Sequence, residues 1–299
     1  MTKNWSAIVE PAPSIHPSKS SNQLLWSDED GFSVEACGTG NQPEYKLCFW
    51  DEVTARINPQ QKTIRITPLS PATTPATLEH LLHDQIYPRL LAHEGQLVLH
   101  AGAVKIGDQL AVFLGDSGMG KSTLVASLYQ AGAALLNDDT LVATAEANGF
   151  YGQAIYQGLC LLPDSLASLF PQQTKTRPMA HYSPKQRLDV ALASEQDSRP
   201  RALGALFFLA PASTAIGLRR MTAAEACMGL ITNSFSLDPT DTALARHKLQ
   251  QAAALANGIP AFALSYPRDY NILPQVHTAI RAKMAECRPQ PDLKGELSF

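Results

Sequence analysis

The chain has 299 residues, of which 45% are hydrophobic and 17% are charged, and its formal net charge is -3. This length supports a sizeable core in one or two domains, and the composition excludes a disordered chain, a nucleic-acid-binding footprint and a polybasic membrane patch. No run reaches the roughly 18 apolar residues of a membrane span, and the N-terminus lacks a secretory h-region. We therefore expect a cytoplasmic protein with neither a nucleic acid nor a membrane as partner.

The five cysteines are Cys37, Cys48, Cys160, Cys227 and Cys287. They are widely scattered, odd in number, and include no CxxC pair. The spacing therefore predicts neither a disulfide framework nor a zinc site.

The N-terminal part divides into three predicted segments. Residues 1–22 are rich in Pro and Ser and predict a flexible tail. Short apolar runs bounded by Gly, Asn and Pro predict a small β-rich subdomain over 23–75, with a loop or hinge at 71–75. Leu and Ile at helical spacing predict a helix over 77–93, which Pro88 kinks or splits.

Residues 76–299 are assigned to a larger α/β core domain. Its predicted elements are strands at 96–104 and 110–114, a helix at 121–130, strands at 134–137, 203–210 and 217–221, helices at 222–235 and 238–257, a strand at 261–266 and a helix at about 273–286. Gly132 is placed to end the helix at 121–130. We expect the polar residues 174–184 to be a mobile loop, and 171–187 to be a substrate loop or lid.

A glycine-rich loop joins the strand at 110–114 to the helix that follows. It comprises Gly115, Asp116, Ser117, Gly118, Met119, Gly120, Lys121, Ser122 and Thr123. These residues satisfy the pattern GxxxxGK[ST], in which glycines let backbone N–H groups curl round phosphates and the lysine reaches the β and γ oxygens. The hydroxyl of Ser122 is the expected Mg²⁺ ligand. The alternative is a glycine-rich turn that binds nothing, but the flanking strand and helix favour a nucleoside triphosphate site.

Asp138 and Asp139 come at the end of the next apolar strand. Adjacent parallel strands would place such an acid beside Mg²⁺ and the γ-phosphate. One carboxylate could then hold the metal while the other receives the proton of an attacking hydroxyl. The alternative is a turn or capping acid.

His100 is predicted to lie at the end of a strand that runs beside the phosphate-loop strand. A lone histidine is more often a packed or surface residue, although its pKa suits proton transfer near neutrality. The residues alone leave both interpretations open.

Three segments together, 99–104, 115–123 and 130–139, resemble the catalytic domain of bacterial HPr kinase/phosphorylase. The resemblance covers residues 96–142 well and implies a P-loop kinase fold related to phosphoenolpyruvate carboxykinase, with ATP and Mg²⁺ as cofactors. It implies that Lys121 and the loop bind phosphates, that Ser122 and Asp139 hold the metal, and that Asp138 is the general base, with His100 assisting.

The N-terminal segment does not resemble the regulatory domain of that family, and its second signature loop with Gly-Arg elements is not found. The layout is closer to shorter HPr-kinase-like proteins, which include kinases of the C-terminal serine of lasso-peptide precursors. This resemblance also implies that Lys185, Arg187 and Arg268 neutralise the transferring phosphate.

The sequence therefore favours a kinase that phosphorylates a Ser or Thr hydroxyl on a peptide or small protein. A second hypothesis is an ATP-binding regulator or leader-peptide-binding partner without phosphotransfer, because the same loop occurs in nucleotide-dependent switches and in kinases. A small-molecule kinase is a third. A homo-oligomer is compatible with each of them.

Overall fold

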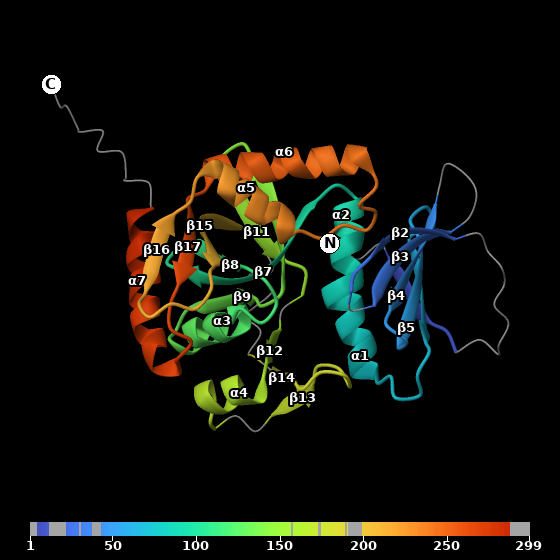
Figure 1. Ribbon diagram of the computed structural model, residues 1–299, viewed down its shortest axis with the longest axis horizontal. Coiled ribbons are helices and arrows are strands. Elements are labelled where there is room, and N and C mark those ends of the chain that lie inside the picture. The colour runs from blue at the N-terminus through green and yellow to red at the C-terminus, as the bar shows by residue number, and fades with distance from the viewer. Residues whose placement is uncertain are drawn as a thin grey trace.

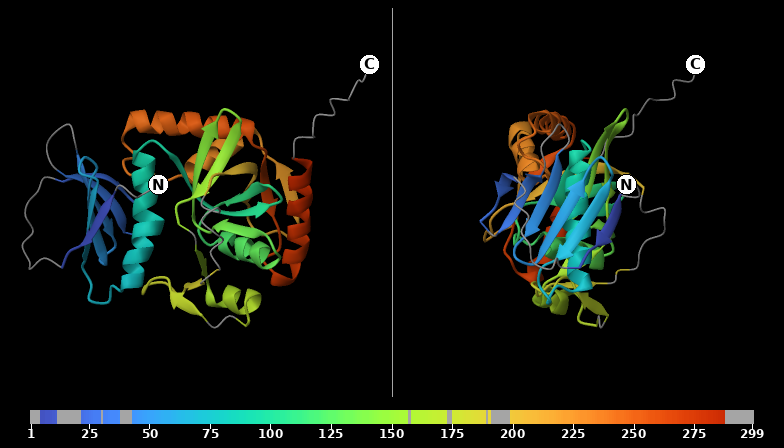
Figure 2. Two further views of the ribbon diagram at one scale, coloured as in Figure 1. Left: turned by 180° about the vertical axis from the view of Figure 1, so that it is seen from behind. Right: turned by 90° about the vertical axis from the view of Figure 1, so that its right-hand side faces the viewer.

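The computed structural model describes residues 5–11, 22–29, 31–37, 43–156, 158–172, 175–188, 190 and 199–287. A β-sheet formed by the N-terminal residues stands beside a larger α/β part, and a long helical segment lies between them (Figures 1 and 2). The predicted mixed α/β class and the β-rich N-terminal region are thus both observed.

The N-terminal sheet has the strand order β1-β6-β5-β4-β3-β2. Its strands are β1 (Ser6–Val9), β2 (Gln23–Ser27), β3 (Phe32–Cys37), β4 (Glu44–Phe49), β5 (Val53–Asn58) and β6 (Thr63–Pro68). All neighbours are antiparallel except β1, which pairs in parallel with β6. Alternating residues of β3 to β6 point inward and form one core with the helical segment.

The prediction of a tail over 1–22 is wrong for the described residues 5–11. β1 extends the sheet, and the buried Trp5 donates its indole N–H to Glu94 at 3.1 Å. The pairing with β6 is long-range, so the local composition on which the prediction relied carried no sign of it. Residues 1–4 and 12–21 of the predicted tail lie outside the described part of the chain.

The helical segment consists of α1 (Pro75–His80), the π-helix η1 (Leu81–Ile86) and α2 (Tyr87–His93). The N–H of Tyr87 donates to the carbonyl of Leu82, five residues back. Pro88 has no N–H to continue an α-helix, and the wider turn before it accommodates its ring, so the predicted kink is a π segment. The segment was assigned to the core domain, yet it also contributes to the core of the N-terminal sheet.

The larger sheet has the order β11-β10-β7-β8-β15-β17-β16, with β9 paired to β7 and β11 also paired to β15. Its strands are β7 (Leu97–Ile106), β8 (Gln109–Leu114), β9 (Ala134–Asn137), β10 (Thr140–Glu146), β11 (Gly149–Ala154), β15 (Arg201–Leu209), β16 (Gly217–Arg220) and β17 (Ala261–Ser265). β8, β15 and β17 are mutually parallel.

Helices cover both faces of this sheet (Figure 1). On one face lie α3 (Lys121–Gln130) and α7 (Leu273–Glu286), and on the other α5 (Ala223–Thr232) and α6 (Thr242–Gly258). Strand β8 shows why: Phe113 joins the core under α3 and α7, whereas Val112 joins the core under α5 and α6. Because successive side chains of β8 point to opposite faces of the sheet, both faces of the strand are buried, and this packing holds its carboxyl end in place.

The structure corrects the expected neighbour of the phosphate-loop strand. β9, which leads to the acid pair, is parallel to β8 but does not touch it, because β7 lies between them and is antiparallel to both. The acids therefore approach the loop across β7.

The polar middle of the chain is more ordered than predicted. It contains α4 (Pro163–Leu169) and a small sheet of β12 (Leu159–Leu161), β14 (Gln186–Leu188) and β13 (Thr176–Pro178). The expected mobile loop at 174–184 thus includes a strand, while its residue 174 lies outside the described residues. The short 3-10 helix η3 (Tyr270–Ile272) precedes α7.

Two further findings concern the ends of predicted helices. α3 ends at Gln130 as predicted, and Gly132 has φ +87°. α6 begins later than predicted, because Asp241, and not Asp238, caps it by accepting from the N–H groups of Ala243 and Leu244.

In the described chain no helix is long and apolar enough to span a membrane, and the cysteines are free.

Candidate functional site

The glycine-rich loop leaves the carboxyl end of β8 and turns directly into α3. Gly118 and Gly120 have φ values of +79° and +86°, a conformation that side-chain-bearing residues rarely adopt. The first hydrogen bond of α3 runs from the N–H of Leu124 to the carbonyl of Gly120. The N–H groups of Lys121, Ser122 and Thr123 therefore precede the helical ladder and can bind an anion at the positive end of the helix.

Asn233, at the end of α5, holds the start of this loop. Its side-chain oxygen accepts the N–H of Gly115 at 3.1 Å, and its side-chain N–H donates to the carbonyl of Gly229 at 2.8 Å. Its backbone carbonyl accepts the N–H of His100 at 2.7 Å. One residue thus connects the loop to strand β7. Sequence reasoning missed it, because an asparagine that ends a helix signals only a cap.

Lys121 lies buried under the loop. Its Nζ donates to the carbonyls of Gly115 at 2.6 Å and Asp116 at 3.1 Å. Burial lowers the pKa of Lys121, and the carboxylates of Asp139 and Asp138 oppose that shift. An ammonium group has three N–H donors, so one remains for a ligand oxygen.

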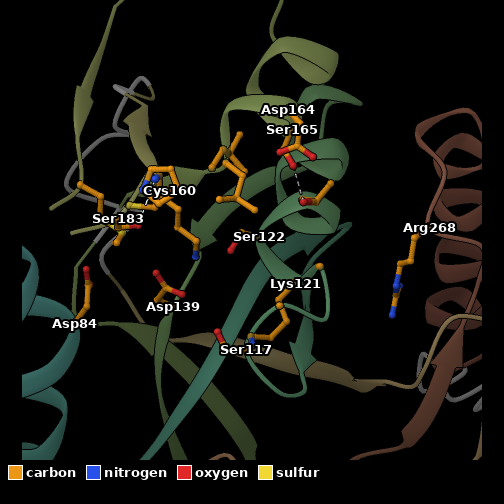
Figure 3. A pocket seen from close by; sticks show the side chains of 18 of the residues that line it. Asp84, Ser117, Lys121, Ser122, Asp139, Cys160, Asp164, Ser165, Ser183 and Arg268 are labelled. Atoms are coloured by element: carbon orange, nitrogen blue, oxygen red, sulfur yellow. Dashed lines mark hydrogen bonds between the residues drawn. The ribbon is translucent and has the colours of Figure 1, made fainter. Parts of the chain in front are cut away.

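A cavity of about 730 Å³ opens beside the loop (Figure 3). Its walls come from the loop and α3, from Asp139, from residues 179–185, from α4 and from the segment around Tyr270. In Figure 3, Ser122 and Lys121 lie between Asp139 on one side and Arg268 on the other. This volume falls within the range of about 300 to 1,000 Å³ that is usual for small-molecule sites.

The two acids have different environments. Asp139 lines the cavity, whereas Asp138 is only 3% exposed and lies outside the cavity lining. One oxygen of Asp138 accepts the N–H of Cys160 at 3.0 Å, and the other is buried with no hydrogen-bond partner among the described residues. Burial, and next the charge of Asp139, raise the pKa of Asp138, against the hydrogen bond from Cys160 and the charge of Lys185. The unpaired oxygen calls for a cation or a proton.

Close packing between β7 and the acid pair fixes the position of both carboxylates. The N–H of Ala101 donates to the carbonyl of Asp139 at 3.1 Å. A Cβ atom on Gly102 would lie 2.8 Å from the carbonyl oxygen of Asp138 and 2.7 Å from Val125. Glycine at this position lets the backbone of the acid pair approach the strand.

His100 is the fourth residue of β7, which places it within the strand and not at its end. The strand does run beside β8, as predicted. The ring lies edge-on to Phe235, with centroids 6.1 Å apart. Burial lowers the pKa of His100, while the charge of Asp139 opposes the shift, so its imidazole is neutral near pH 7.

The three predicted cations separate in space. Lys185 and Arg268 line the cavity, and Arg268 donates to the carbonyl of Ala210 at 2.9 Å. Arg187 does not line it: it is 3% exposed and donates to Asp84 at 3.2 Å. A buried, paired guanidinium is not available to a transferring phosphate, so the expected role of Arg187 is not supported.

Asp84 is a second residue that sequence reasoning missed. It lies in the π segment η1, lines the cavity, and bonds to the Nδ1 atom of His80 at 2.8 Å as well as to Arg187. This cluster joins the helical segment to the sheet of β12 to β14. The only local signal was an acid inside an apolar helix pattern.

Comparisons with known proteins give little further guidance. No protein-family model matches the chain, and a search of curated proteins finds no match. Among solved structures, the chain is similar to the HPr(Ser) kinase/phosphatase from Coxiella burnetii, with a TM-score of 0.35 and 13% identity, over 63% of this chain and 97% of that one. A likeness at this TM-score supports no conclusion about fold or activity.

Proposed function

We propose that the protein is an ATP- and Mg²⁺-dependent kinase that transfers the γ-phosphoryl group to a Ser or Thr hydroxyl of a peptide or small protein. The observation that carries this proposal is the meeting of Asp139 and His100 with Ser122 and Lys121 around one cavity. The phosphate-binding loop alone would also be compatible with an ATP-binding regulator. A carboxylate and a neutral imidazole facing the loop supply the proton acceptor that a hydroxyl nucleophile needs.

The loop would bind and orient the nucleotide. The N–H groups at the start of α3 would donate to phosphate oxygens, and the ammonium of Lys121 would neutralise charge on the β and γ phosphates. Such positioning supplies most of the rate enhancement in phosphoryl transfer.

Ser122 and Asp138 fit a magnesium ion better than Ser122 and Asp139 do. Asp138 carries an unpaired buried oxygen, and its carboxylate and the Ser122 hydroxyl are both hard oxygen donors. No group of three His, Cys, Asp or Glu side chains able to hold a metal occurs in the described residues. A Mg²⁺ site with few protein ligands agrees with this, because phosphates and water complete its coordination. The ion, when bound, would offset the charge that develops on the phosphate oxygens.

We therefore assign the base to Asp139, which reverses the roles expected from the sequence. Asp139 faces the cavity, where an acceptor hydroxyl can reach it, whereas Asp138 does not. In the transfer, the acceptor oxygen forms a bond to the γ-phosphorus as the bond to the β,γ-bridging oxygen breaks. Asp139 takes the hydroxyl proton, and ADP leaves. The neutral imidazole of His100, on β7, assists Asp139 in this proton transfer. Lys185 and Arg268 offset the negative charge of the transferred group.

Three variants test these roles with Mg-ATP and serine peptides, read by intact mass for one added phosphate. We expect Asp139→Asn to lower kcat by about 10² to 10⁴ with ATP affinity unchanged. Asp138→Asn should raise the Mg²⁺ concentration needed for half-maximal rate, and Lys121→Ala should weaken both ATP binding and turnover. Full activity of Asp139→Asn would remove the base assignment.

The choice of acceptor decides between the kinase and its alternatives. The resemblance of the chain's layout to shorter HPr-kinase-like proteins makes the C-terminal serine of a lasso-peptide precursor the first acceptor to assay. Release of ADP without a phosphorylated product would support the ATP-dependent regulator. Phosphorylation of free hydroxy compounds but not of peptides would support the small-molecule kinase.

A further inference from the structure

A second cavity, of about 430 Å³, lies on the other side of the phosphate loop. His100 and Ser117 line both cavities, so the two meet at the residues that face the proposed phosphoryl-transfer point. Its other lining residues come from the N-terminal sheet, α2 and the segment after α5. Its volume is within the usual range for small-molecule sites.

The cation of this cavity is Arg89, which forms no ion pair in the described part of the chain. Its Nη1 donates to the backbone carbonyl and the side-chain oxygen of Gln85, both at 2.9 Å and both uncharged. The carboxylate that acts on it electrostatically is Asp28, one oxygen of which accepts the N–H of Phe32 at 2.8 Å. Burial lowers the pKa of Arg89 to about 10, so it stays charged near pH 7. A half-buried guanidinium that is hydrogen-bonded to no carboxylate favours an anionic ligand.

Two aromatic rings hold this guanidinium in place. Its central carbon lies 4.4 Å from the ring centroid of Phe32 and 5.3 Å from that of Phe235. Together with Trp26, these rings give the cavity an apolar wall. Stacking on rings and bonding to Gln85 orient the group, so little entropy is lost when a ligand binds its remaining N–H donors.

We infer that the second cavity binds the phosphate acceptor, and that the acceptor carries a carboxylate near its hydroxyl. The carboxylate would pair with Arg89, an apolar group would lie against Phe32 and Phe235, and the hydroxyl would reach His100 and Asp139. The inference rests on the proposed kinase function and specifies its acceptor. Asp116, on the phosphate-loop wall, is the carboxylate of the cavity lining and disfavours an anion at that end. The carboxylate of a peptide acceptor could be its C-terminus or an acidic side chain.

Binding is tested first, without catalysis, by calorimetry on the full chain. The probes are N-acetyl-phenylalanyl-serine as free acid and as amide, and N-acetyl-glutamyl-serine amide against its glutaminyl counterpart. We expect a carboxylate-bearing probe to bind about tenfold or more tightly than its neutral partner. A preference in the first pair identifies the C-terminus and a preference in the second identifies a side chain. No preference in either pair overturns the inference.

Arg89→Gln should abolish that preference while leaving ATP affinity as in the wild type, which also shows that the variant is folded. Arg89→Lys should retain part of the preference, because lysine keeps the positive charge but lacks the paired N–H donors of the guanidinium. Arg246→Gln is the matched control, since Arg246 is exposed on α6 and lines neither cavity. A preference that survives in Arg89→Gln refutes the inference.

Phosphotransfer assays separate this inference from the proposed function. If the preferred probe binds through Arg89 but is never phosphorylated with Mg-ATP, the anion site stands and the kinase function fails. If serine peptides are phosphorylated with the same KM by wild type and Arg89→Gln, the kinase function stands and the inference fails.

Discussion

Replacing Gly102 with alanine should disable the acid pair without touching any side chain in the cavity. A Cβ atom there would lie 2.7 Å from Cγ2 of Val125 and 2.8 Å from the carbonyl oxygen of Asp138. Both distances are shorter than van der Waals contact. The oxygen belongs to the backbone, so it cannot rotate away, and β7 and the Asp138-Asp139 segment must move apart.

The expected size follows from two effects. Overpacking of a core typically costs about 1 to 3 kcal/mol in the free energy of unfolding. A shift of about 1 Å in a catalytic group can cost about 10²-fold in rate. The loss of kcat for Gly102→Ala should therefore exceed what the loss of folded protein explains, because the carboxylates move in the molecules that remain folded.

The matched control is Gly217→Ala. The Cβ atom added there would lie 2.8 Å from Oγ of Ser265 alone, and that hydroxyl can rotate away. We expect its free energy of unfolding to stay within about 0.5 kcal/mol of the wild type. Urea unfolding and kcat are measured for both variants under conditions where both are folded. A Gly102→Ala protein with wild-type kcat would refute the argument, whatever its stability.

Two further predictions concern the support of the site and of its core. Asn233→Ala removes the acceptor for the N–H of Gly115, so ATP should bind about fivefold more weakly, at about 1 kcal/mol per hydrogen bond. Asn257→Ala is the control: it removes only a bond to the carbonyl four residues back, of the kind that Asn233 makes with Gly229, and should leave the affinity unchanged. His277 is hydrogen-bonded to Ser127 at 2.8 Å, and burial lowers its pKa in the folded protein. As the pH falls below about 6.5, the unfolded chain therefore takes up the proton first, and the free energy of unfolding should decrease. His277→Gln should weaken this pH dependence in urea titrations between pH 7 and 5.

Elements with strong local patterns were predictable. The bounds of α3, β9 and α7 agree with the sequence prediction, because each is an apolar run closed by a clear signal such as Gly132. The β10 and β11 hairpin was missed, although Asn148-Gly149, where the turn meets the first residue of β11, is a hairpin signal. The pairing of β1 with β6 had no local signal, because it depends on a partner more than 50 residues away.

The candidate site shows the same division. The phosphate loop follows from its motif, because a contiguous segment carries both the geometry and the chemistry. The burial of Asp138 and the exposure of Asp139 to the cavity do not, because they depend on how β7 and β12 pack round two consecutive residues. The pairing of Arg187 with Asp84 likewise joins elements far apart in the chain. Sequence reasoning finds such residues but cannot assign their partners.

The π segment η1 determines which of the two cavities Arg89 faces. Asp84 and Gln85 lie within it and face the first cavity, while Arg89, one turn later, faces the second. A π turn holds about one residue more than an α turn, and one residue corresponds to about 100° of rotation about the helix axis. Deleting a single residue from 81–86 would restore a regular helix and swing Arg89 by about that angle away from Phe32 and Phe235. The position of Arg89 in the second cavity thus depends on one inserted residue.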